Sequence, residues 1–328
     1  MKLIITVDVE ADNQWRKNSD ISLENIKFLS RFQDLCEKYD FMPTYLVTYE
    51  VANHEESVHI LKKFLEAGKC EIGAHLHPWT TPPFKNDQRD NLVEKSFPNE
   101  LGDEELWNKL KSLTEKIKSS FGIQPISFRA GRWGFDKKMV GYLLKLGYKV
   151  DCSITPKISW KDFKGKKEGI GGPDFRKENV FPSLLSSNKK ANINFKNDLL
   201  EIPMSILYVG ILNKELALIN RYFSMMPNGL VKSILNRLLF RLKWCRIFPE
   251  TRLKDLRDVY KSALRNNLPV LEFMIHSSEL MVGGSPYSKR KKNLENVYYT
   301  LEEFFKYLKD KNIQGTTISD FLALYNKI

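Results

Sequence analysis

The stretch Gly73-Ala74-His75-Leu76-His77-Pro78-Trp79 places two of the five histidines of the chain two residues apart. The residues before it, Lys69-Cys70-Glu71-Ile72, begin what reads as a short buried strand. Alternate residues of a strand point to the same face, so His75 and His77 are expected to converge on one target. Pro78 cannot extend the strand ladder, which places both imidazoles at its C-terminal tip. A divalent metal is the simplest shared target, although two unrelated surface histidines would give the same pattern.

The composition suits one large folded unit. The 328 residues, 42% of them hydrophobic, are enough for a single core, and α/β barrels reach this length as one domain, here 1–328. No apolar run is long enough to span a bilayer, and the first strand reaches Asp8 too early for a signal peptide, so we expect a cytoplasmic protein. Four scattered cysteines indicate free thiols in a reducing compartment: Cys36, Cys70, Cys152 and Cys245.

The formal net charge of +12 implies anionic partners, such as a membrane surface, nucleic acid or a charged substrate. No nucleic-acid-binding motif accompanies the charge, so nucleic acid is not expected among them. The charge leaves a membrane surface or an anionic substrate as the partners to consider.

Short apolar runs alternate with amphipathic stretches, which is the pattern of βαβ units with a parallel sheet. No glycine-rich phosphate loop is present, so the pattern favours a barrel, in which functional groups gather at the C-terminal strand ends. An irregular, lysine- and glycine-rich excursion occupies 155–198. Strands are predicted at 3–8, 43–48, 70–76, 127–132, 149–154, 199–205, 269–276 and 316–318, and helices at 22–38, 55–67, 103–121, 136–146, 253–265 and 301–311.

Acidic residues gather where the first strand ends. Asp8, Glu10 and Asp12 alternate, so they share one face if the chain stays extended. Three carboxylates on one face repel each other unless a cation or a raised pKa relieves them. A solvated acidic loop is the alternative.

Other strands also end in groups that carry chemistry. Arg129 and Arg132, on the fourth strand, could pair with the carboxylates, or they are a surface arginine pair. Asp151 opens the fifth strand among apolar neighbours and needs a partner. His276 closes the seventh strand. Metal ligands, a carboxylate base, a histidine acid and an orienting arginine are the parts of metal-assisted hydrolysis.

In this order and spacing the motifs resemble those of the polysaccharide deacetylase (NodB-homology) family, of carbohydrate esterase type. The resemblance implies a distorted (β/α)7 barrel that removes acetyl groups from sugars with zinc or a similar divalent metal. It covers most of the chain and lies in Thr6–Glu10, Glu71–Pro78, Arg129–Gly134, Asp151 and Phe273–Ser277.

The resemblance also implies roles by position. The acids of the first motif here are separated by one residue and the second is a glutamate, whereas the family has adjacent aspartates. The histidines are two apart rather than four. Asp12 therefore stays open as the third metal ligand in place of Glu10. The implied roles are a base at Asp8, metal ligands at Glu10, His75 and His77, an orienting Arg129, and an acid at His276 tuned by Asp151.

A basic, partly helical insertion at about 206–250 has no counterpart in the minimal family pattern. From Arg221 to Lys254 there are eight lysines or arginines and one acid, Glu250. A basic amphipathic helix of this kind can lie on an anionic membrane, whereas the alternative is a helix packed on the barrel with a solvated basic face. The apolar stripe consists of Val231, Ile234, Leu235, Leu238, Leu239 and Leu242, and Lys232, Arg237, Arg241 and Lys243 fall outside it.

These expectations combine into a metal-dependent hydrolase that removes acetyl groups from a glycan precursor of the cell envelope, lipid-linked or nucleotide-linked. Two alternatives remain. One is hydrolysis of another non-peptide C–N bond in a small amide, and the other is a catalytically silent barrel that binds a glycan or a protein partner. Metal content and acetate release separate the three.

Overall fold

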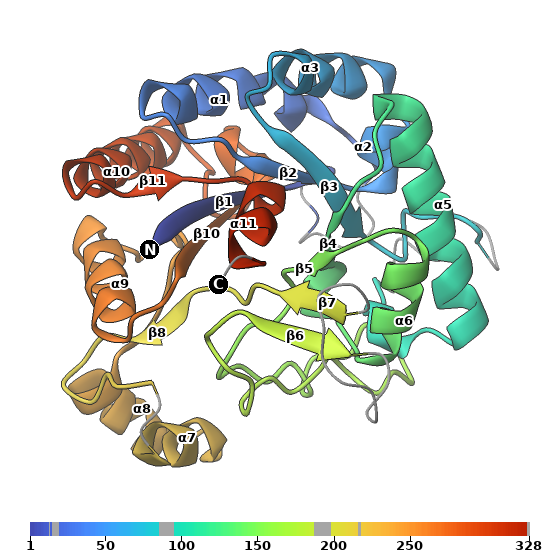
Figure 1. Cartoon of the computed structure of the whole chain (residues 1–328). Helices are drawn as coiled ribbons and strands as arrows, with labels where there is room; N and C mark the ends of the chain where they lie inside the picture. Colours follow the sequence, from blue (N-terminus) through green and yellow to red (C-terminus); the bar gives the residue numbers. More distant parts are fainter. Residues whose placement is uncertain (13, 15–19, 85–94, 187–197, 216–217, 327–328) are drawn as a thin grey trace.

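The computed structural model describes residues 1–12, 14, 20–84, 95–186, 198–215 and 218–326. A mostly parallel sheet curves through the centre of the molecule, and helices cover its outer face (Figure 1). Its strands lie in the order β10 (Val270–His276), β1 (Lys2–Val9), β2 (Thr44–Val47), β3 (Glu71–Leu76), β4 (Ser127–Ala130), β5 (Val150–Asp151), β7 (Asp198–Glu201) and β6 (Ser183–Ser186).

Two strands depart from this simple order. The short strand β11 (Gln314–Gly315) runs parallel to the start of β1, and β6 is antiparallel to β7. The helices along the chain are α1 (Leu29–Lys38), α2 (Tyr49–Ala52), α3 (Glu55–Glu66), α5 (Asp103–Phe121), α6 (Lys138–Lys145), α9 (Leu253–Arg265), α10 (Lys291–Asp310) and α11 (Ile318–Tyr325). Short 3-10 turns are η1 (Glu24–Phe28), η2 (Pro98–Glu100), η3 (Gly131–Trp133) and η5 (Ser277–Leu280).

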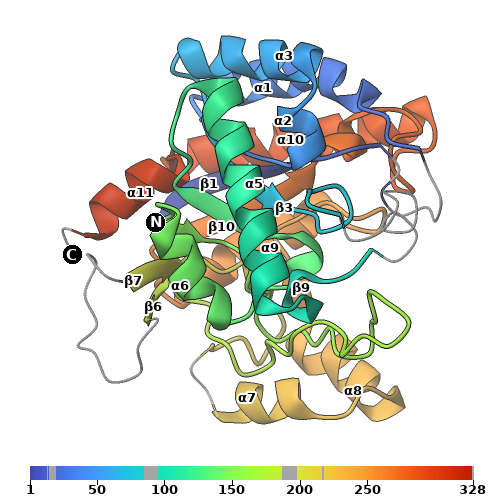
Figure 2. The same ribbon diagram turned by 90° about the vertical axis from the view of Figure 1, so that its right-hand side faces the viewer.

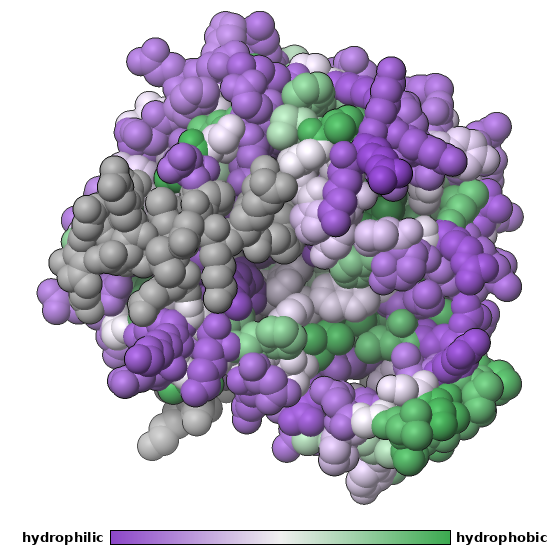
Figure 3. All heavy atoms as spheres, turned by 180° about the vertical axis from the view of Figure 1, so that it is seen from behind, coloured by the Kyte–Doolittle hydropathy of each residue, from purple (hydrophilic) through white to green (hydrophobic). Residues whose placement is uncertain are grey.

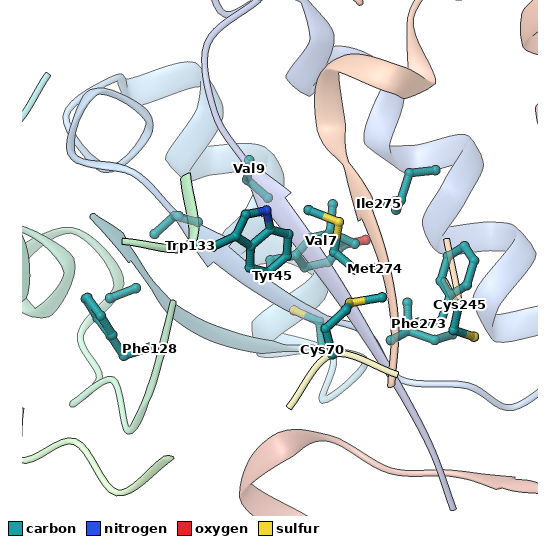
Figure 4. Packing of buried hydrophobic residues seen from close by; sticks show 14 of the residues in the cluster. Val7, Val9, Tyr45, Cys70, Phe128, Trp133, Cys245, Phe273, Met274 and Ile275 are labelled. Atoms are coloured by element: carbon teal, nitrogen blue, oxygen red, sulfur yellow. The ribbon is translucent and has the colours of Figure 1, made fainter. Parts of the chain in front are cut away.

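The main core lies between the sheet and the surrounding helices (Figure 4). Val7 and Val9 of β1, Phe128 of β4 and Phe273 of β10 are fully buried in it. Each full burial of such a side chain is worth about 1.5–3 kcal/mol. The apolar faces of the amphipathic helices supply the other side of this core, which fixes the curvature of the sheet and thereby where its strand ends meet.

Helix α11 covers the end of the sheet where the strands begin. Its backbone N–H groups donate to the side chains of Thr44 and Glu71, which start β2 and β3. Its residues Ile318 and Phe321 join a separate inner cluster with Ile4 of β1. The opposite end, where the strands finish, carries the polar side chains.

Most predicted elements are confirmed. Helix α5 has the predicted bounds and stops at Gly122, whose φ of +73° is the left-handed conformation that ends helices. The helix predicted at 22–38 is instead divided into η1 and α1, and α10 begins ten residues before the predicted helix at 301–311. The last strand, predicted at 316–318, lies two residues earlier, and β6 was not predicted.

The insertion forms a small unit of its own beside the sheet. It contains α7 (Leu218–Met225), α8 (Leu230–Leu235) and a π-helical turn η4 (Asn236–Phe240) between two antiparallel strands, β8 (Ile206–Tyr208) and β9 (Leu242–Trp244). The predicted helical stripe ends before Leu242, because Arg241 adopts a left-handed φ of +51° and the chain turns into β9.

Candidate metal centre and active site

The polar ends of β1, β3 and β10 meet around one cavity of about 860 Å³. The parallel register places Asp8 beside His276 and His75 beside Arg129. The cavity is lined by Asp8, Glu10, His75, His77 and His276, together with aromatic and cationic side chains. The barrel rule, by which functional groups lie at C-terminal strand ends, therefore holds here.

Glu10, His75 and His77 form a compact set of three buried groups. One side-chain atom from each lies within 4.8 Å of the others. The Nε2 atoms of His75 and His77 lie 3.8 Å and 3.2 Å from Oε2 of Glu10. These three groups lie at the ends of β1 and β3, the strands on either side of β2 in the sheet.

The two imidazoles are held in different ways. Nδ1 of His75 lies 3.2 Å from the carbonyl oxygen of Arg129, and a hydrogen donated there leaves the Nε2 lone pair facing the cavity. The ring of His77 stacks on Trp79 at a centroid separation of 4.2 Å. Its Nδ1 is buried without a hydrogen-bond partner among the described residues, so stacking rather than hydrogen bonding fixes this ring.

The electrostatics of this set fit a divalent cation. Burial lowers the pKa of His75 to about 4 and that of His77 well below its usual value, so both rings are neutral at pH 7. Burial and the nearby Asp8 charge raise the pKa of Glu10. Two neutral imidazoles and one carboxylate are a donor set typical of zinc, and a cation would offset the repulsion between Asp8 and Glu10.

Asp12, the other candidate ligand, already has hydrogen-bond partners for its carboxylate. Its carboxylate accepts hydrogen bonds from the Ser22 hydroxyl, from the N–H groups of Glu24 and Asn25, and from the Asn25 side chain. It therefore caps the start of η1. The chain does not stay extended to Asp12, which separates this acid from the other two.

We therefore expect Glu10→Ala to lose bound metal and Asp12→Ala to keep it. Losing the cap should instead lower the free energy of unfolding of Asp12→Ala by about 1 kcal/mol. Metal content per chain by elemental analysis, together with thermal melting, tests both. Loss of metal in Asp12→Ala with retention in Glu10→Ala would make Asp12 the third ligand.

Arg129 is fully buried beneath Asp8. Its Nη1 donates to Oδ1 of Asp8 over 2.6 Å, its Nη2 donates to Glu272 over 2.7 Å, and its Nε donates to the carbonyl of Cys152 over 2.9 Å. Burial by itself raises the pKa of Asp8, but the Arg129 guanidinium and the rings of His75 and His276 outweigh it, and the pKa is lowered. Asp8 is thus ionised, with Oδ2 turned toward those rings.

Glu272 was missed as a site residue, although the sequence carried a signal. It is an acid inside the apolar run of β10, and a buried carboxylate requires a partner. Its carboxylate accepts hydrogen bonds from the Arg129 guanidinium and from the hydroxyl of Thr6. Arg129 therefore joins two acids from adjacent strands.

His276 also lies beside Asp8. Its Nε2 is 3.9 Å from Oδ2 of Asp8, and its Nδ1 is 2.8 Å from Oε1 of Glu279. Arg246 donates to the same oxygen of Glu279. Burial by itself raises the pKa of Glu279, but Arg246 and His276 outweigh it and the pKa is lowered, so this residue presents a charged carboxylate to the ring.

Asp151 does not occupy the place that the sequence-based interpretation gave it. It accepts hydrogen bonds from the hydroxyl and N–H of Ser153, and it pairs in register with Glu201 of β7. The carboxylate that contacts His276 belongs to Glu279, three residues after the histidine. Glu279 thus holds the position beside His276 that was expected for Asp151. The sequence signal was the acid that follows His276 in a tight turn.

Asp151 and Glu201 form a fully buried pair of acids. Burial raises the pKa of both, and that of Glu201 is raised further by the charge of Asp151, so the pair holds a proton to higher pH than exposed carboxyl groups do. The unfolded chain has already released that proton above its ordinary carboxyl pKa. The pair therefore makes the folded protein less stable as pH rises above about 4.

Glu201→Gln should flatten this pH dependence, because an amide donates to Asp151 without titrating and can still accept from the N–H of Ile154. We expect it to be more stable than the parent at pH 8 and similar to it near pH 4. Thermal melting at both pH values tests this. Equal destabilisation at both would mean that the pair does not share a proton.

A tight turn after β4 brings β3 and β4 together at the site. A methyl group on Gly131 would lie 2.4 Å from the Leu76 carbonyl oxygen and 2.6 Å from the His77 ring, so only glycine fits. Arg132 and Trp133 both have positive φ, a strained conformation for residues with side chains. Of the two arginines in the motif, Arg129 pairs with carboxylates, whereas Arg132 lies over the ring of Phe97.

Comparison with known proteins identifies the fold. No family model and no curated protein matches the sequence. Among solved structures, a protein described as a polysaccharide deacetylase from Mycobacterium smegmatis superposes with a TM-score of 0.57 at 12% identity, over 98% of this chain and 88% of that one. The allantoinase PuuE gives 0.54 at 13%, also over 98% and 88%.

A 4-alpha-glucanotransferase from Thermococcus litoralis superposes with a TM-score of 0.54 at 10% identity, over 98% of this chain but 40% of that one. At such identities the likeness concerns the fold. The chain has the α/β fold of the polysaccharide deacetylases, a distorted (β/α)7 barrel, as its motifs predicted.

Proposed function

We propose that this protein is a metal-dependent hydrolase that removes acetyl groups from a saccharide. The observation that carries the proposal is the meeting of Glu10, His75 and His77 with Asp8 and His276 in one cavity. The first three form a donor set for a cation. The other two flank it with an ionised carboxylate and an imidazole.

Glu10, His75 and His77 would hold the ion, which we propose to be zinc, because a carboxylate and two imidazoles match its ligand preferences. When bound, such an ion supplies Lewis-acid polarisation of the acetyl carbonyl and favours the ionisation of water. The arrangement fits hydrolysis better than a purely structural site, because three protein ligands leave a position for substrate.

Asp8 and His276 carry out the two proton transfers of the reaction, and Arg129 and Glu279 hold them in position. Oδ2 of Asp8 takes the proton of the attacking water, while Arg129 holds the other oxygen and keeps the carboxylate in place. His276 lines the same cavity, with its Nε2 near Asp8, and donates a proton to the leaving nitrogen or oxygen of the sugar. Glu279 holds Nδ1 of the same ring, which fixes its direction.

The cavity walls favour a saccharide that carries an anionic group. Indole and phenol rings line it, and flat aromatic faces suit the apolar faces of sugar rings: Trp79, Trp133, Trp160, Trp244 and Tyr287. Cationic side chains outnumber the two lining acids: Lys95, Arg132, Lys164, Lys166, Lys167 and Arg246. We propose a sugar bearing a phosphate or a similar charge.

The second candidate, hydrolysis of a small amide, has the likeness of its fold to an allantoinase in its favour. A cavity of about 860 Å³ with several aromatic walls is large for a small amide. We therefore rank the saccharide first.

Metal analysis of the purified protein beside an acetate-release screen tests the proposal. We expect one divalent ion per chain, with acetate released from N-acetylated sugar phosphates faster than from the neutral sugars. His75→Ala and His77→Ala should each lose the ion and the activity. His59→Ala, at an exposed position on α3, is the matched control and should lose neither.

Other results would support one of the two alternative functions. A bound ion with activity only on non-sugar amides supports the second candidate. A folded parent protein that takes up no ion, even when metal is supplied, supports a barrel that binds a glycan or a partner without catalysis.

A further inference from the structure

Large apolar side chains gather on the exposed surface of α7, α8 and η4. Elsewhere in the described parts of the chain, exposed apolar side chains are mostly scattered. Figure 3 shows the gathering as a hydrophobic patch at the lower right of the view. Seven of its members are 47–77% exposed, and we call them the insertion patch: Leu218, Ile219, Tyr222, Leu230, Val231, Ile234 and Leu238.

The insertion patch is a second apolar face, additional to the one that folds the insertion. On the inner side, Phe223 stacks on Phe240 at a centroid separation of 3.7 Å, and Tyr208 contacts both. Leu235 and Leu239 pack against this inner cluster. The helices are thus already anchored from within, so the outer apolar side chains are available to a partner.

The exposed charges that the insertion itself places beside the insertion patch are positive. Lys214, Arg221 and Arg237 are exposed beside it. Between 211 and 243 the sequence has a single acid, Glu215, and it is buried against Lys157 with an Nζ–Oε2 distance of 2.8 Å. A partner of this face therefore meets apolar groups together with the exposed positive charges of the insertion.

We propose that the insertion patch docks the protein on an anionic phospholipid bilayer. Apolar side chains of short helices enter the boundary between headgroups and acyl chains, and flanking cations meet the anionic headgroups. None of the helices in the described residues is long and apolar enough to cross a bilayer, so the contact is peripheral. All four cysteines are free and buried, in keeping with the reducing cytoplasmic side.

The insertion patch is joined to the loop that lines the cavity. The hydroxyl of Ser224 in α7 donates to the carbonyl of Arg176, in the excursion that also supplies Phe163, Lys164 and Lys167 to the cavity wall. Figure 2 shows this excursion directly beside α7 and α8. Docking would bring the cavity near a lipid-linked saccharide. That extension rests on the proposed hydrolase function, whereas docking itself does not.

Co-sedimentation of the full chain with vesicles tests the docking. We expect binding to mixed phosphatidylcholine–phosphatidylglycerol vesicles, and much weaker binding to phosphatidylcholine alone. Leu230→Glu combined with Val231→Glu should weaken binding by about tenfold or more. Arg221→Gln combined with Arg237→Gln should weaken it by about fivefold per charge.

Tyr299→Glu is the matched control, because Tyr299 is 65% exposed on α10, away from α7 and α8 (Figure 1). It should bind like the parent, and all variants should melt like the parent and release acetate equally from a soluble substrate. Failure of the parent to bind anionic vesicles overturns the proposal. So does a parent dimer that Leu230→Glu with Val231→Glu converts to monomer, because the insertion patch would then join two copies of the chain.

Discussion

Asp8→Asn is expected to lower turnover by a factor of about 10²–10⁴, the usual contribution of one acid–base group, while bound metal is retained. Asparagine keeps an oxygen that can accept from Arg129, but its amide cannot take a proton from water. Arg129 also stays anchored by Glu272. Single-turnover acetate release and elemental analysis on the same preparation give both readouts.

Two results would contradict this role for Asp8. Its Oδ2 lies 3.7 Å from Nε2 of His75, so loss of the ion in Asp8→Asn would make this carboxylate a metal ligand. Unchanged turnover would leave the site without its proposed base. Glu272→Gln is the matched control, since it alters the other partner of Arg129 and should reduce turnover far less.

His276→Ala should also lower turnover by a factor of about 10²–10⁴, with metal content unchanged. The reason is the proton that the leaving group requires, so substrates with better leaving groups should lose less. Rates on a series of acetyl esters and amides of graded leaving-group basicity measure this. Equal loss across the series would contradict the role of His276 as the acid.

Glu279→Gln separates positioning from proton donation. A glutamine can still hold Nδ1 of His276, but it withdraws the negative charge beside the ring. We expect a smaller loss than in His276→Ala and a changed pH profile of kcat. A profile identical to that of the parent would mean that Glu279 serves only to hold Arg246.

The sequence predicted the ends of the strands better than the contacts beyond them. Asp8, Glu10, His75 and His77 could be placed because strand periodicity decides which residues share a face. Glu279 and Glu201 could not, since Glu279 reaches His276 through a 3-10 turn and Glu201 pairs with Asp151 of a strand distant in sequence. Asp12 was misleading because the chain bends before it, and only the hydrogen bonds to η1 show that its carboxylate is occupied.

The insertion shows a different limit. Its apolar spacing correctly predicted helix for part of its length, but periodicity cannot say that one set of leucines packs on Phe223 and Phe240 while another set faces outward. The left-handed turn at Arg241 was equally hidden, because arginine has no special preference for that conformation. Both features depend on neighbours outside the segment.

The docking of α11 on the strand starts links the last helix of the chain to the cavity. Glu71 opens β3 and accepts from both the N–H and the hydroxyl of Ser319 in α11. His75 follows four residues later in the same strand, and His77 lies just past its end. Helix α11 therefore holds the start of the strand whose other end positions the two histidines. Any fusion or truncation that loosens α11 is expected to disturb the positions of His75 and His77. A tag placed directly after α11 is therefore a poor choice when metal affinity is to be measured.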